Sequence, residues 1–81
     1  MFIYLFFRPV VIDGCNVGYQ YGLNDQFSAK GLQIAYKYFQ DKGYRDEDIT
    51  IIYKHIPLQY LTEEDVAILD HLEKIRVLVR T

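Results

Sequence analysis

The residues best suited to chemistry gather in one short segment, Asp13-Gly14-Cys15-Asn16, directly after an apolar run. A carboxylate and a carboxamide supply oxygen ligands, and Mg²⁺ takes one or two protein carboxylates while water and substrate phosphate complete its shell. Asp13 is therefore the candidate metal ligand, and Asn16 the candidate group that supports it. Asp and Asn are also ordinary turn formers at the end of a strand, and the spacing alone favours that simpler interpretation.

Several other reactive or aromatic residues lie near this segment or near the ends of expected elements. Cys15 has no histidine close by, so we expect a small packed thiol rather than a nucleophile. Tyr19 and Tyr21 follow the acidic segment, where aromatic rings can stack on unpaired bases. Lys30 falls at the start of an expected helix, where it either helps backbone N–H groups to hold a phosphate or stays solvated. His55 is a weaker candidate.

The elements that must position these residues alternate between strands and helices. Short apolar runs at residues 9–12, 49–53 and 77–79 predict three parallel strands, because continuous apolar residues suit strands covered on both faces. Helix patterns lie between them, which gives the order β-α-β-α-β. In open parallel sheets ligands gather beyond the carboxyl ends of the strands, and Asp13 stands at that place.

Capping residues predict where the helices begin and end. Ser28 is an expected N-cap, and Lys42-Gly43 ends that first helix with a cation and a glycine. Thr62 opens the second helix and can form a capping box with Asp65. The second helix is expected to bury one apolar stripe, made of Val66, Leu69, Leu72 and Ile75.

The predicted topology leaves one face of the sheet bare. Crossovers between parallel strands are right-handed, so a sheet that grows in one direction has both helices on the same face. The strands are nevertheless apolar on successive positions, so we expect the chain to be an incomplete half of a doubly wound sheet. We also expect an unpaired edge on the first strand, a marginal core, and self-association through the uncovered face.

Length and charge exclude several classes of protein. The chain has 81 residues and a formal charge of −2, so it forms one small domain at most and has no overall basic field for nucleic acid. Any contact with RNA must come from a local site. The single cysteine excludes an internal disulfide and favours a reducing compartment, the cytoplasm or the nucleus. Residues 1–7 form an apolar N-terminal extension that is too short to span a membrane.

Two segments carry a resemblance to a known family. Arg-Pro-Val-Val-Ile-Asp-Gly-Cys-Asn-Val at 8–17 and Phe-Ser-Ala-Lys-Gly-Leu at 27–32 resemble the opening of the NYN domain in Regnase-type endoribonucleases. These nucleases are associated with CCCH zinc fingers and belong to the PIN-like superfamily. Residues 39–43, 49–52 and 72–79 follow in the same order. The resemblance implies a three-layer, doubly wound parallel sheet of the α/β class, of which residues 8–81 would be the N-terminal half.

The resemblance also implies a function. It implies a metal-dependent endoribonuclease that cuts single-stranded or stem-loop mRNA with Mg²⁺ or Mn²⁺. Asp13 would hold the metal or activate water, with Asn16 as its catalytic companion. The expected RNA contacts are Lys30, which stands in the matched segment 27–32, and Tyr19 and Tyr21, whose aromatic rings can stack on bases. The other acids of the family follow the third strand, beyond this sequence, so we expect the chain alone not to cleave. A relative that binds RNA or protein without cleaving is the alternative.

Overall fold

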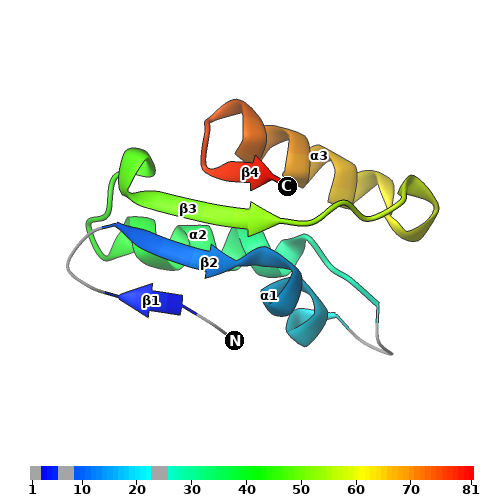
Figure 1. The fold of residues 1–81 in the computed structure, drawn as a ribbon, viewed down its shortest axis with the longest axis horizontal. Helices are drawn as coiled ribbons and strands as arrows, with labels where there is room; N and C mark the ends of the chain where they lie inside the picture. Colours follow the sequence, from blue (N-terminus) through cyan, green and yellow to red (C-terminus); the bar gives the residue numbers. More distant parts are fainter. Residues whose placement is uncertain (1–2, 6–8, 23–25) are drawn as a thin grey trace.

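The order of strands and helices along the chain can be followed in Figure 1. The computed structural model describes residues 3–5, 9–22 and 26–81. Its elements are β1 (Ile3–Leu5), β2 (Val10–Asp13), α1 (Gly14–Tyr21), α2 (Lys30–Asp41), the 3₁₀ turn η1 (Asp46–Asp48), β3 (Ile49–Tyr53), the 3₁₀ turn η2 (Leu58–Tyr60), α3 (Glu63–Lys74) and β4 (Leu78–Arg80).

One four-stranded sheet with the order β1-β2-β3-β4 organises the chain. Strands β2, β3 and β4 are parallel, with Ile12 opposite Ile51 and Ile51 opposite Leu78. The α/β class and the three parallel strands are therefore confirmed. Strand β1 runs antiparallel to β2 and covers its outer edge. The expectation that the first parallel strand has an unpaired edge is wrong, because the apolar residues before it pair with it.

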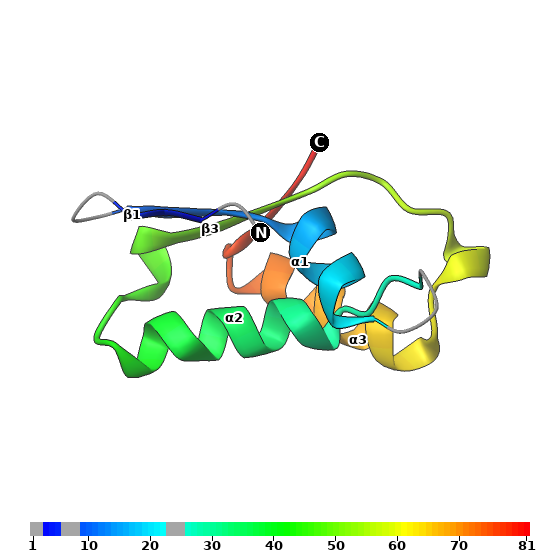
Figure 2. The same ribbon diagram turned by 90° about the horizontal axis from the view of Figure 1, so that it is seen from below.

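All three α-helices lie on one side of the sheet, which Figure 2 shows edge-on. This follows from a sheet in which each parallel connection steps in the same direction. On the opposite side of the described strands, Val11 and Thr50 are half-buried, while Ile52 is 39% and Val79 46% exposed. The expected bare face is thus present in the part of the chain that the structure describes.

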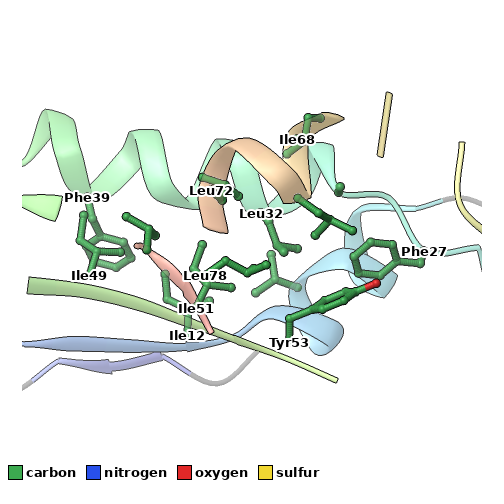
Figure 3. Packing of buried hydrophobic residues seen from close by; sticks show 14 of the residues in the cluster. Ile12, Phe27, Leu32, Phe39, Ile49, Ile51, Tyr53, Ile68, Leu72 and Leu78 are labelled. Atoms are coloured by element: carbon green, nitrogen blue, oxygen red, sulfur yellow. The ribbon is translucent and has the colours of Figure 1, made fainter. Parts of the chain in front are cut away.

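The core lies between the sheet and the helix layer, as Figure 3 shows. Branched residues of the strands, such as Ile12 and Ile51, meet Leu32 and Phe39 of α2 and Leu72 of α3, and all of these side chains are almost fully buried. Burying a large apolar side chain stabilises the fold by about 1.5–3 kcal/mol, so these contacts supply most of the driving force. The same core fixes the carboxyl ends of β2 and β3 side by side.

The segment after β2 forms a helix, α1, which the expected order β-α-β-α-β does not include. Asp13 is its N-cap, and the Asp13 side chain accepts a hydrogen bond from the backbone N–H of Asn16. Helix α1 contains glycine at positions 14 and 18, which lowers its intrinsic helix propensity. Its stability therefore comes from packing against neighbouring elements.

The expected N-cap at Ser28 is also wrong. Helix α2 begins at Lys30 after Ala29, with no side chain capping it. The backbone N–H of Ala29 instead donates to Asp65 Oδ1 at 2.9 Å, a bond from a residue distant in sequence. The prediction that Lys42-Gly43 ends this helix is confirmed: α2 ends at Asp41, and Gly43 follows with a φ of +94°, a left-handed conformation that glycine adopts readily.

The expected capping box of α3 is confirmed. Thr62 Oγ1 accepts from the N–H of Asp65, and Asp65 Oδ2 accepts from the N–H of Thr62, both at 3.0 Å. Asp65 is only 5% exposed and also accepts from Ala29, so one carboxylate joins the start of α3 to the start of α2. The buried residues of α3 are Asp65, Ile68, Leu69 and Leu72. The predicted stripe is therefore right for Leu69 and Leu72, whereas Val66 and Ile75 are only half-buried.

The Asp65 tie predicts a large loss of stability in Asp65→Ala. The substitution removes the acceptors of two N–H groups, that of Thr62 in the capping box and the buried one of Ala29, so we expect a loss of about 2–4 kcal/mol. Urea unfolding followed by circular dichroism measures it. Glu64→Ala removes an exposed acid from the same helical turn and should cost less than about 1 kcal/mol. Equal losses in the two variants would contradict the role of Asp65.

Candidate active site

Asp13 occupies the carboxyl end of β2, in the strand position opposite Ile52 of β3. Asp13 is exposed to solvent, and one of its carboxylate oxygens, Oδ1, accepts a hydrogen bond from the backbone N–H of Asn16 at 3.1 Å. Asp13 therefore does both things that its type predicts: it caps a helix, and it presents an oriented carboxylate to solvent.

Gly14 lets α1 begin in direct contact with β3. A Cβ atom at this position would lie 2.8 Å from Cγ2 of Ile51 and 2.9 Å from the carbonyl oxygen of Ile52. Both distances are too short for any other residue unless the strand shifts. The structural role of Gly14 is this close approach, at the first residue of α1. This contact between Gly14 and β3 fixes the start of α1, and with it the position of Asp13 opposite Ile52.

Asn16 supports Asp13 through its main chain rather than through its carboxamide. The backbone N–H makes the bond to Asp13, while the side-chain oxygen Oδ1 is buried and has no hydrogen-bond partner among the described residues. A buried polar atom without a partner costs about 1–3 kcal/mol. An unpartnered buried polar atom in a native structure calls for an explanation, and an ion or water that binds it is one.

Cys15 has a structural role, as expected. Its Sγ accepts from the backbone N–H of Lys54 at 3.4 Å and lies 3.8 Å from the Lys54 carbonyl oxygen. The thiol therefore joins α1 to the segment that follows β3. His55, in that segment, is exposed, and it makes no hydrogen bond with the rest of the described chain.

The expected RNA contacts lie at the other end of α1. Tyr19 and Tyr21 are each 47% exposed, and the edge of Tyr19 packs against Phe27 at 5.6 Å between ring centres. A Cβ atom at Gly31 would lie 2.7 Å from Cβ of Tyr21, so the start of α2, with its exposed Lys30, adjoins Tyr21. Helix α1 has eight residues and spans about 12 Å, which separates this group from Asp13.

Several other acidic residues are engaged elsewhere. Asp46 accepts a hydrogen bond from the Tyr36 hydroxyl at 2.6 Å, and this bond raises the pKa of Tyr36 to about 12. Arg80 donates to Glu73 at 3.0 Å and to Asp70 at 3.4 Å. Within residues 3–5, 9–22 and 26–81, no group of three or more His, Cys, Asp or Glu side chains is arranged to hold a metal.

Tyr53 is a polar feature of this end of the sheet that the sequence pattern did not single out. The residue is fully buried at the end of β3, and its hydroxyl has no hydrogen-bond partner in the described part of the chain. Figure 3 shows the hydroxyl beside the ring of Phe27, whose centre is 5.6 Å from that of Tyr53. Burial raises the pKa of Tyr53, and the nearby charge of Arg80 opposes that rise. In the sequence Tyr53 is one apolar strand residue among several.

Comparison with known proteins gives one family. A model of the Zc3h12a-like ribonuclease NYN domain matches residues 7–81, a span that includes Asp13, Asn16 and Lys30. A search among curated proteins finds no match. No helix in the described residues is both long and apolar enough to cross a membrane.

Proposed function

The chain belongs to the Zc3h12a-like ribonuclease NYN domain family, and from that membership we propose that it carries part of the active site of a metal-dependent endoribonuclease. The family match confirms the resemblance drawn from residues 8–17 and 27–32. The observation that supports the proposed activity most directly is the exposed carboxylate of Asp13, held by the N–H of Asn16 at the carboxyl end of β2. We further propose that residues 8–81 form the N-terminal half of that domain.

The residues at this end of β2 fit a hard divalent cation. Nucleases of this kind generally depend on divalent metal, and Mg²⁺ or Mn²⁺ would be held by Asp13, with the unpartnered Oδ1 of Asn16 as a further oxygen donor. Such an ion supplies an activated water and offsets charge on the phosphate. A single carboxylate holds it weakly, so further carboxylates from outside the described residues are needed for cleavage.

The chain's own residues orient the site and the substrate. The N–H of Asn16 fixes the Asp13 carboxylate, and Gly14 lets α1 begin directly against β3. RNA is the substrate that a ribonuclease domain implies. Because the chain has a net charge of −2, the RNA must be held by local contacts, for which Lys30, Tyr19 and Tyr21 at the far end of α1 are the candidates.

A second candidate function is binding without cleavage. It is favoured by one observation: within the described residues, Asp13 belongs to no group of three or more His, Cys, Asp or Glu side chains that could hold a metal. In this case the same surface would bind RNA or a protein partner. The two functions differ in a measurable way, because only the first requires metal and Asp13.

We predict that the 81-residue chain alone does not cleave RNA. In-line hydrolysis requires a held metal, an aligned water and neutralised phosphate charge, and these tasks need several convergent carboxylates. The measurement is incubation of the purified chain with a labelled single-stranded RNA and Mn²⁺, beside its Asp13→Asn variant. Metal-dependent cleavage by the chain but not by the variant would refute this prediction.

In a longer form of the protein that does cleave, Asp13→Asn should reduce the cleavage rate by about a hundredfold or more. Asparagine is as good an N-cap as aspartate, so α1 and the fold should remain intact. Circular dichroism checks the fold, and Asp41→Asn, at an exposed acid of α2, serves as the control that keeps its activity. Near-normal cleavage by Asp13→Asn would remove Asp13 from the active site.

A further inference from the structure

A hollow of about 440 Å³ lies at the far end of α1 from Asp13. Its walls come from three parts of the chain: the end of α1 with Tyr21, the segment before α2 with Gln26 and Ser28, and the start of α3 with Thr62 and Glu64. Figure 2 shows these parts converging at the end of the molecule where α1, α2 and α3 meet. The hollow is large enough for a planar ring and its substituents.

The walls of the hollow are tied together by hydrogen bonds. Asp65 joins the N–H of Ala29 to the start of α3, as described above. The carbonyl oxygen of Gly18 accepts from the N–H groups of both Gly22 and Ser28, at 3.0 and 3.1 Å, and so joins α1 to the segment before α2. A site formed in advance loses less entropy when a ligand binds, which favours recognition of a small rigid group.

The groups that line the hollow select a neutral, planar ligand with N–H donors. Tyr21 offers a half-exposed aromatic ring. The side chains of Gln26, Ser28 and Glu64 make no hydrogen bond to another described residue and are free to bind a ligand. Three acids in the first turn of α3 repel a phosphate from this position. A carboxylate and an aromatic ring that line the same hollow instead suit a base that stacks and donates hydrogen bonds from its edge.

We propose that this hollow binds an unpaired base of the RNA, with the ring against Tyr21 and the base N–H groups donating to Glu64. The inference rests on the proposed ribonuclease function and adds a base-recognition site to it. Guanine is the preferred base, because its adjacent N1–H and amino groups both donate to one carboxylate. The site lies about 12 Å from Asp13 along α1, so one short stretch of single strand reaches both.

The test is titration of the ¹⁵N-labelled 81-residue chain, in EDTA, with oligouridine and with the same oligomer carrying one guanine. We expect the guanine oligomer to bind about tenfold more tightly and to shift the amide signals of Gln26, Ser28 and Glu64. Glu64→Gln should bring the two affinities close together, and Tyr21→Leu should weaken the binding of both oligomers. The controls are Tyr38→Leu, at a tyrosine that is 54% exposed on α2, and Glu47→Gln in η1, which should both bind as the parent does.

Two results would overturn the proposal, and they differ in what else they exclude. Equal binding of the two oligomers, with no effect of Glu64→Gln, would remove the base site and leave the RNA-binding function in place. Absence of binding to either oligomer, by a chain whose amide signals show a folded protein, would contradict RNA binding by this chain together with the base site.

Discussion

The close contact between α1 and β3 at Gly14 is the constraint on which the candidate site depends. With no Cβ at this position, the helix begins directly against Ile51 and the backbone of Ile52. Asp13 is thereby the last residue of a strand and the first capping residue of a helix, and its carboxylate takes one defined orientation from the N–H of Asn16. The opposite end of α1 is set by the same packing, because Gly31 brings α2 against Tyr21.

Asp65 supplies the second tie between elements that are distant in sequence. It completes the capping box of α3 and accepts from Ala29, so the start of α3 is joined to the segment before α2. The helix layer covers only one face of the sheet, and the other face presents Ile52 and Val79. The fold thus combines a strand end that carries an oriented Asp13 carboxylate with an apolar face that is open in the described residues.

Much of the fold could be predicted from local patterns, and the exceptions have physical causes. The run at 49–53 is a strand as its β-branched residues predict, and the capping box between Thr62 and Asp65 is visible in four consecutive residues. The expected order β-α-β-α-β omits helix α1, because two glycines lower the helix propensity of its eight residues, whereas packing stabilises it. Asp13 was found as a strand-end acid, but the bond of Ala29 to Asp65 joins positions too far apart for any spacing rule.

The most direct test of the central claim, that Asp13 is the metal-binding carboxylate, is paramagnetic broadening of backbone amide signals by added Mn²⁺. The account predicts that the signals of Asp13 and Asn16 broaden at the lowest metal concentration, and that Asp13→Asn abolishes this effect while the amide signals otherwise keep their positions. Broadening centred instead on the acidic residues of η1 or on the first turn of α3, unchanged by Asp13→Asn, would contradict it.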